Sequence, residues 1–195
     1  MEFEAFPKIT RLKRACVITE KIDGTNAQIA IEALDGYEDY DPNCVFSADG
    51  LALYVGSRTR WITPGDDNFG FAAWVKDHAE ELLGLGEGRH FGEWWGRGIQ
   101  RNYGLQERKF SLFNTSRWGN SSRPSCCDYV PVLYAGDFFT GAVEEALEKL
   151  RSLGSIAAPG FMKPEGIVVY HAASKTMFKC TIEKDEEPKG KQVYP

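Results

Sequence analysis

The sequence lacks the long apolar run that a membrane-spanning helix needs. None of its 195 residues belongs to an apolar stretch that approaches about 18 residues, the length that can cross a bilayer. The first ten residues, MEFEAFPKIT, also lack the basic-then-apolar order of a secretory signal. The sequence therefore predicts a cytoplasmic protein with no membrane partner.

Cysteine is scarce, and acidic residues outnumber basic ones. The five cysteines are odd in number, two of them (Cys126 and Cys127) are adjacent, and none has the paired spacing of a zinc site. Reduced thiols are the simplest interpretation. The net charge of −5 argues against broad, non-specific binding of nucleic acid, although a local basic face is compatible with it.

Most segments of the sequence have the pattern of a strand, and few have the periodicity of a helix. One helix is predicted at about residues 68–83, and another from an N-cap at Thr140 to a C-cap at Gly154. The aperiodic segment 115–129 is predicted to be a long surface loop. The predicted strands are 15–19, 26–33, 43–47, 51–57, 90–95, 109–114, 166–171 and 175–181.

The order of these segments predicts the fold class. Many strands, few helices and no strand–helix–strand alternation favour an α+β fold with mainly antiparallel sheets. No linker suggests a division of the chain, so residues 1–181 are expected to form one domain. Residues 182–195 are expected to be a polar tail.

The most informative segment is the heptapeptide Glu20–Asn26, EKIDGTN. Lys21 ends a β-branched approach, Asp23-Gly24 is a turn signal, and an alternating pattern follows. A lysine amine is protonated at neutral pH, and it becomes a nucleophile where desolvation or a nearby positive charge lowers its pKa. Lys21 is therefore a candidate nucleophile, and the alternative is a surface lysine beside an ordinary turn.

Two further segments carry groups that could bind phosphate. Arg58 and Arg60 follow a predicted strand, and guanidinium groups bind phosphate by forked hydrogen bonds. Lys175 and Lys179 have the even spacing that places side chains on one side of a strand. Taken singly, each is also typical of a solvated surface.

Two carboxylates and a phenylalanine complete the candidate set. Glu93 lies within an apolar strand pattern, where a buried carboxylate needs hydrogen-bond donors such as ribose hydroxyls. Glu165 precedes another apolar strand and could hold a metal. Phe113 offers an aromatic face for a purine, although it could equally belong to the core.

Together and in this order, these segments resemble the motifs of a known family. EKIDGTN, SRTR, FGEWWG, KFSLFN and PEGIVVY resemble those of the covalent nucleotidyltransferases, which comprise polynucleotide ligases and capping enzymes. The likeness is greatest to the ATP-dependent RNA ligases of the phage and RNA-editing type, which seal nicks. It extends from Glu20 to Thr181. It departs in the last motif, where FKCT retains one lysine in place of the usual two, and no appended OB-fold is expected in 182–195.

The resemblance implies a nucleotidyltransferase fold and an ATP-dependent RNA ligase that joins 5′-phosphate and 3′-hydroxyl ends through a lysine–AMP intermediate. Lys21 would be the nucleophile, Glu165 would hold Mg²⁺, and RNA ends or a nicked duplex would be the partner, with an accessory protein or domain possible. The nucleotide-binding residues would be Glu20, Ile22, Asn26, Glu93, Phe113 and Lys179. Arg58, Arg60 and Asn26 would contact the phosphate end of the nucleic acid.

Three alternatives share these features. A minimal DNA ligase and a GTP-dependent capping guanylyltransferase use the same lysine chemistry. A non-catalytic module that binds nucleic-acid ends on a ligase scaffold is the third. It is disfavoured by the joint retention of Lys21, Glu93, Glu165 and Lys179.

Overall fold

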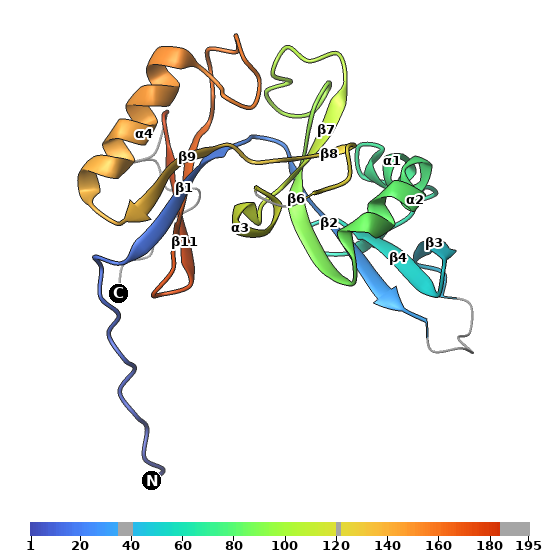
Figure 1. Ribbon diagram of the computed structural model, residues 1–195, viewed down its shortest axis with the longest axis horizontal. Helices are drawn as coiled ribbons and strands as arrows, with labels where there is room; N and C mark the ends of the chain where they lie inside the picture. Colours follow the sequence, from blue (N-terminus) through green and yellow to red (C-terminus); the bar gives the residue numbers. More distant parts are fainter. Residues whose placement is uncertain (35–40, 120–121, 184–195) are drawn as a thin grey trace. The chain divides into compact units, whose positions relative to one another are not determined.

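The computed structural model describes residues 1–34, 41–119 and 122–183 (Figure 1). The chain forms two compact units. Unit 1 consists of residues 1–21 and 131–195, and unit 2 consists of residues 22–130. Most of the tail predicted at 182–195 lies outside the described residues.

Unit 1 is a four-stranded antiparallel sheet with one long helix. The sheet order is β11-β10-β1-β9, and α4 covers one of its faces (Figure 1). The elements are β1 (Ala15–Lys21), β9 (Val132–Asp137), α4 (Thr140–Leu153), β10 (Gly166–His171) and β11 (Thr176–Thr181).

Alternate side chains of β1 contribute to the core of unit 1. Cys16 and Ile18 point to the α4 side, where they pack with Leu147 and Leu150. The helix ends at the predicted Gly154, whose φ of 78° favours glycine. The N-cap is Phe139 and not the predicted Thr140, which is the first helical residue.

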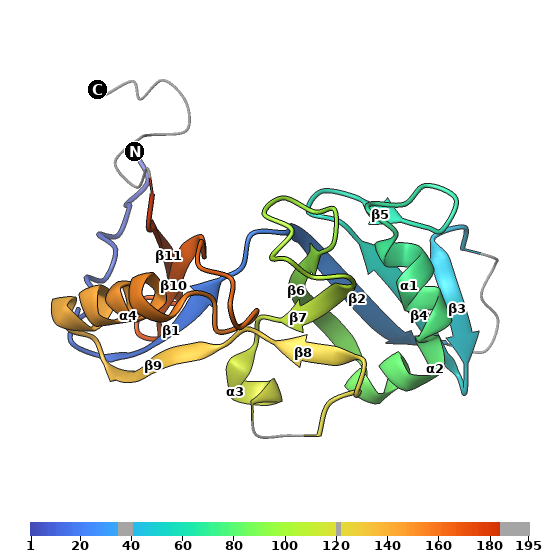
Figure 2. The ribbon, with the colours of Figure 1, turned by 90° about the horizontal axis from the view of Figure 1, so that it is seen from above.

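Unit 2 is a seven-stranded sheet covered by short helices. The order is β3-β4-β2-β6-β7-β8, with β5 paired to β4. Helices α1 and α2 pack on one face, beside β4 and β7 (Figure 2). The strands are β2 (Thr25–Ala33), β3 (Cys44–Ala48), β4 (Leu51–Gly56), β5 (Trp61–Ile62), β6 (Gly88–Gly96), β7 (Arg108–Leu112) and β8 (Cys127–Tyr129). The helices are α1 (Phe71–Asp77), α2 (Ala79–Leu82), the 3₁₀ turn η1 (Leu83–Leu85) and α3 (Thr115–Trp118).

An aromatic cluster forms the centre of the unit 2 core. Phe71 lies 5.2 Å from Trp94 and 5.0 Å from Phe110, measured between ring centroids. Trp74 lies 5.1 Å from Trp94 on the same side of the sheet. These tilted contacts are the geometry that aromatic rings prefer, and they attach α1 to β6 and β7.

The single helix predicted at 68–83 is divided in the structure. It breaks at His78, whose φ of −113° is not helical. The Trp74 carbonyl oxygen accepts the backbone N–H of His78 at 3.1 Å and also lies 2.8 Å from the ring Nδ1 of that residue.

The predicted loop at 115–129 contains two ordered elements, α3 and β8. Asn114 accepts a hydrogen bond from the Arg117 N–H at 3.1 Å and so caps α3. β8 adds a parallel strand beside β7, and this pair is an exception to the antiparallel pattern. The strands β5 and β9 were also not predicted from the sequence. β8, with three residues, and β5, with two, are too short to show a period in the sequence.

The predicted α+β class with antiparallel-dominated sheets is confirmed. Every strand pair except β7–β8 is antiparallel among those that the structure describes. All five cysteines are free thiols. Of the helices in the described part of the chain, none has the length and apolarity to span a membrane.

Replacing Phe110 by alanine should destabilise unit 2 strongly. Its side chain is fully buried and its ring packs on those of Phe71 and Trp74, and removing a buried phenylalanine costs about 3–5 kcal/mol of unfolding free energy. Urea unfolding measures this change. Phe91→Ala is the matched control, since Phe91 is 52% exposed and should cost far less. Equal costs would contradict the assignment of the core.

Candidate active site

Lys21 lies at the predicted corner. It is the last residue of β1, and β2 begins at Thr25, so three residues join strands that belong to different sheets. The Lys21 Nζ donates to the Glu165 Oε2 at 2.5 Å. The two side chains are 24% and 13% exposed, so this ion pair is largely shielded from water. The structure therefore brings the predicted nucleophile together with the predicted metal ligand.

Lys179 shares a face of the unit 1 sheet with Lys21. Lys179 pairs with Val168, which in turn pairs with Thr19, two residues before Lys21 on β1. Paired residues of an antiparallel sheet point to the same face, and this face is opposite α4. Lys21 and Lys179 therefore place two lysine side chains on the same side of the sheet.

The prediction that Lys175 and Lys179 share a strand is wrong. β11 begins at Thr176, and Lys175 lies in the preceding turn with a φ of 53°. A residue in the left-handed region does not continue the two-residue alternation of a strand. Lys179 alone therefore represents the last motif on β11.

Glu20 points away from Lys21, into the α4 side, and is 1% exposed. Its carboxylate accepts hydrogen bonds from the Ser155 hydroxyl (2.5 Å) and from the N–H groups of Ile156 (2.8 Å) and Ala157 (2.9 Å). Burial raises the pKa of this carboxyl, and these three bonds lower it in part. The carboxylate holds the loop after α4, which is a correction to its predicted use as a nucleotide contact.

Ile22 is also withdrawn from solvent, since its side chain is 4% exposed. Any contact of Ile22 with a nucleotide is therefore left to its backbone groups.

In unit 2, Glu93 is buried and bonded, as its position in an apolar strand requires. It is 8% exposed. Its carboxylate accepts from the Gly24 N–H at 3.0 Å and from the Asn26 amide at 3.2 Å. A Cβ on Gly24 would lie 2.4 Å from the Trp94 carbonyl oxygen and 2.7 Å from the Trp95 Cβ, so only glycine allows this approach.

Phe113 lies just beyond β7, where its side chain is 39% exposed. Its N–H donates to the Phe91 carbonyl at 2.9 Å, which continues the register that pairs Glu93 with Ser111. Asn26 pairs with Glu93 in the same row. Asn26, Glu93 and Phe113 therefore belong to the face of the unit 2 sheet opposite α1 and α2. An exposed ring on that face is available to stack on a base.

The two predicted phosphate-binding arginines differ in the structure. Arg58 is exposed in the turn between β4 and β5. Arg60 makes a two-pronged ion pair with Asp66, at 2.5 Å and 3.1 Å. Asp66 thus occupies the guanidinium edge that a phosphate would use, and Arg58 is the more available of the two.

Sequence reasoning missed the groups that hold Asp23. The Asp23 N–H donates to the Tyr103 hydroxyl oxygen at 2.7 Å, and the Asp23 carboxylate accepts from the Arg101 Nε at 3.0 Å. Arg101 and Tyr103 lie about 80 residues further along the chain, in an irregular loop. No periodic signal connects such a loop to a turn.

Gln28 is a further residue without a sequence signal. It pairs with Gly56 and Phe91 on the same sheet face as Asn26 and Glu93. Its Oε1 is the one buried side-chain nitrogen or oxygen atom in the described residues that has no hydrogen-bond partner. Buried polar atoms rarely stay unbonded, so this acceptor marks a place for a donor on that face.

The metal prediction rests on Glu165 alone. Within residues 1–34, 41–119 and 122–183, no group of three histidine, cysteine or acidic side chains could hold an ion by itself. Mg²⁺ commonly uses one or two carboxylates and completes its shell with waters and substrate phosphates. A single carboxylate beside a lysine, as in the Glu165–Lys21 pair, fits that kind of site.

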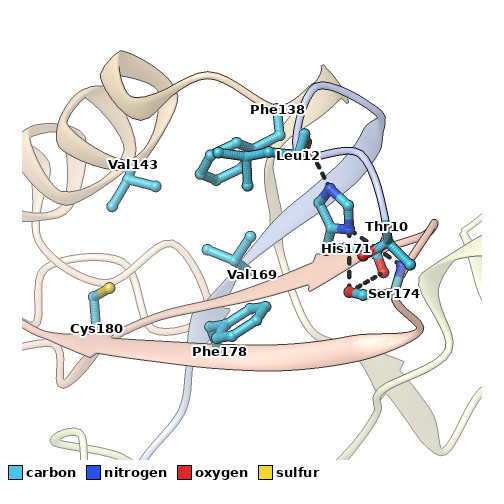
Figure 3. A pocket seen from close by; sticks show the side chains of 9 residues that line it. All are labelled: Thr10, Leu12, Phe138, Val143, Val169, His171, Ser174, Phe178 and Cys180. Atoms are coloured by element: carbon cyan, nitrogen blue, oxygen red, sulfur yellow. Dashed lines mark hydrogen bonds between the residues drawn. The ribbon is translucent and has the colours of Figure 1, made fainter. Parts of the chain in front are cut away.

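A separate recess lies on the opposite face of the unit 1 sheet. It has a volume of about 340 Å³ and is lined mainly by apolar side chains, among them Val143, Val169 and Phe178 (Figure 3). Val169 and Phe178 are paired residues on the α4 side. The recess is therefore not the site of Lys21 and Lys179.

Comparison with known proteins agrees with this description. A family model described as RNA ligase matches residues 14–181. The chain therefore belongs to the RNA ligase family, whose members are enzymes. No curated protein sequence matches the chain.

Solved structures of Naegleria gruberi RNA ligase share the fold. A lysine-to-alanine variant with ATP and Mn matches with a TM-score of 0.55 and 17% identity, over 92% of this chain and 53% of that one. A glutamate-to-alanine variant with AMP and Mn gives 0.56 and 18%, over 91% and 53%. An apo aspartate-to-alanine variant gives 0.56 and 17%, over 91% and 53%. This chain thus spans about half the length of the protein it matches.

Replacing Glu20 by glutamine should change how stability depends on pH. Because folding raises the pKa of Glu20, its contribution to stability is complete below the unfolded-state pKa and is lost as pH rises through the folded-state value. Glutamine does not titrate. The unfolding free energy of the parent protein should therefore fall relative to Glu20→Gln as pH rises above 4.5, the ordinary value.

Urea unfolding of both proteins at several pH values measures this difference. Glu148→Gln is the control, because Glu148 is exposed on α4. The raised pKa would be contradicted if the unfolding free energy of the parent, minus that of Glu20→Gln, stayed constant or rose with pH.

Proposed function

We propose that this chain is an ATP-dependent RNA ligase that joins 5′-phosphate and 3′-hydroxyl ends through a covalent Lys21–AMP intermediate. The single observation that carries the proposal is the corner at Lys21. There, a lysine shares a shielded ion pair with Glu165 and a sheet face with Lys179, in a chain of the RNA ligase family.

In the first step, the Lys21 amine attacks the α-phosphorus of ATP. A nitrogen–phosphorus bond forms, the bond from the α-phosphorus to the bridging oxygen breaks, and pyrophosphate leaves. The amine must first leave the Glu165 carboxylate, to which it donates, and it loses a proton in the course of the attack. The covalent intermediate divides phosphodiester synthesis into steps with good leaving groups.

In the second step, an oxygen of the RNA 5′-phosphate attacks the α-phosphorus. The nitrogen–phosphorus bond breaks, the lysine recovers its amine, and the 5′ end carries AMP. In the third step, the 3′-hydroxyl attacks this activated 5′-phosphate and loses its proton. A phosphodiester forms and AMP leaves.

Charge on the reacting phosphate needs compensation. Lys179 is the protein cation that we assign to this task, because it shares a sheet face with Lys21. Mg²⁺ held by Glu165 would supply further positive charge to the phosphate. The Naegleria gruberi structures with ATP and Mn or AMP and Mn support a nucleotide and a divalent cation for this chain.

Other residues are assigned to the rest of the substrates. We assign the ribose to Glu93 and the adenine to Phe113, since the first is a bonded carboxylate and the second an exposed ring. Arg58 and Asn26 are assigned to the phosphate end of the RNA. An accessory protein or domain that contributes to RNA binding remains part of the proposal.

Lys21→Ala should abolish transfer of label from α-³²P ATP to the protein, because no other amine is assigned to the attack. Lys21→Arg should also abolish it, since a guanidinium keeps the charge beside Glu165 but is not a nucleophile. Label retained on a denaturing gel is the measurement. Lys149→Ala, on α4, is the matched control and should take up label normally.

The labelling gel, together with assays of joining and of RNA binding, tests the alternatives. Label from GTP in place of ATP would favour a capping guanylyltransferase, and joining of DNA but not RNA would favour a DNA ligase. A protein that takes no label but binds RNA ends would be the non-catalytic module. Label on Lys21→Ala would remove Lys21 as the nucleophile.

Arg58→Ala should reduce the sealing of a nicked RNA duplex more than it reduces Lys21–AMP formation. Arg58 is exposed and is assigned to the nucleic acid, where loss of a phosphate contact costs about tenfold at moderate salt. Arg60→Ala is the comparison, and its effect should be smaller because Asp66 already binds that guanidinium.

Both assays are run on one preparation across a salt series. Removal of a phosphate contact should also make sealing less dependent on salt. Equal losses of charging and sealing in Arg58→Ala would place Arg58 on ATP and not on RNA.

A further inference from the structure

The turn after Lys21 is held by a loop that comes from a distant part of unit 2. This loop, residues 97–107, joins β6 to β7. From it, the Arg101 Nε donates to the Asp23 carboxylate at 3.0 Å, and the Tyr103 hydroxyl oxygen accepts from the Asp23 N–H at 2.7 Å. One residue of the turn is thus held through both its side chain and its backbone.

Neither contact is an ordinary surface contact. Tyr103 is 2% exposed, and its ring meets Trp95 edge-on, with 5.0 Å between centroids, so packing fixes the position of its hydroxyl. The Arg101 and Asp23 side chains are each 28% exposed. Partial burial strengthens such a charged pair relative to one in open solvent.

The loop backbone adopts conformations that few residues adopt. Gln100, Asn102 and Tyr103 have φ values of 44°, 60° and 51°, the left-handed region that residues other than glycine seldom occupy. The Asn102 side-chain oxygen accepts from the Gly98 N–H at 2.7 Å and braces this conformation. Strain of this kind persists only where the surroundings enforce it, and it concentrates at functional sites.

The held turn also leads directly to Glu93. Gly24 follows Asp23, and its N–H donates to the Glu93 carboxylate at 3.0 Å. Movement of Asp23 would therefore displace the donor that orients this carboxylate, to which we assign the ribose. Lys21 stands two residues before Asp23, so the same turn is the covalent continuation of the nucleophile.

We propose that Arg101 and Tyr103 are positioning residues for the transfer of AMP to Lys21, and that they act by holding Asp23 in place. The inference rests on the proposed function. The inference gives Arg101 and Arg58 different roles. The Arg101 guanidinium binds a protein carboxylate, whereas Arg58 is assigned to a nucleic-acid phosphate.

Arg101→Ala should lower the rate of Lys21–AMP formation at saturating ATP by at least about tenfold, the effect of losing one charge-assisted hydrogen bond. Arg101→Lys should restore part of the rate, because it keeps the charge but loses the planar geometry. Tyr103→Phe removes only the hydroxyl and should also slow the reaction. Arg97→Ala is the matched control, from the same loop, and should stay within about twofold of the parent rate.

A second assay separates positioning from RNA binding. Sealing of an RNA nick whose 5′ end already carries AMP does not use the Lys21 amine, so Arg101→Ala should leave that reaction within about twofold. Equal losses in charging and in this bypass reaction would overturn the proposal, because they would place Arg101 on the nucleic acid.

A third measurement does not depend on ligase activity. Hydrogen–deuterium exchange of residues 22–26 should be faster in Arg101→Ala and Tyr103→Phe than in the parent and in Arg97→Ala, because the Asp23 N–H loses its fixed acceptor or its brace. Unchanged exchange would overturn the proposal. If the parent protein took no label from ATP, the proposed function would fail, and the exchange result would still show whether the loop holds the turn.

Discussion

The alternation of side chains along β1 is the constraint on which the candidate site depends. Neighbouring residues of a strand point to opposite faces of the sheet, so Glu20 and Lys21 cannot serve the same side. Glu20 enters the α4 side, where three donors hold its carboxylate. Lys21 is left on the other face with Glu165 and Lys179. One step along the chain thus separates a structural carboxylate from the amine that we propose as the nucleophile.

Buried carboxylates recur as organisers of irregular backbone in this protein. Glu20 holds the loop after α4, and Glu93 holds the turn after Lys21. A carboxylate away from water needs donors, and backbone N–H groups outside helices and sheets need acceptors. Each pairing satisfies both requirements at once. Segments that lack secondary structure thereby gain fixed positions.

Under the proposed function, Glu93 would serve both the structure of the turn and the binding of the ribose. Gly24 and Asn26 both donate to it, so its oxygens are oriented before any nucleotide arrives. Preorganised groups of this kind contribute to catalysis because they need no rearrangement during the reaction. The absence of a side chain on Gly24 makes the arrangement possible, since a Cβ there would meet the backbone of Trp94.

The sequence alone determined the α+β class, most strands and the helix that ends at Gly154, because these depend on hydrophobic periods and on turn residues read over short windows. It also marked Lys21, Glu93 and Glu165 as candidate site residues by residue type and order. Only the tertiary structure decided that Glu20 faces the core, that Asp66 binds Arg60, and that Arg101 and Tyr103 hold Asp23. The β8 and β9 strands and the break at His78 were also beyond the sequence. The physical reason is that these features depend on partners brought together by folding, and no local pattern records which partner a polar group will find.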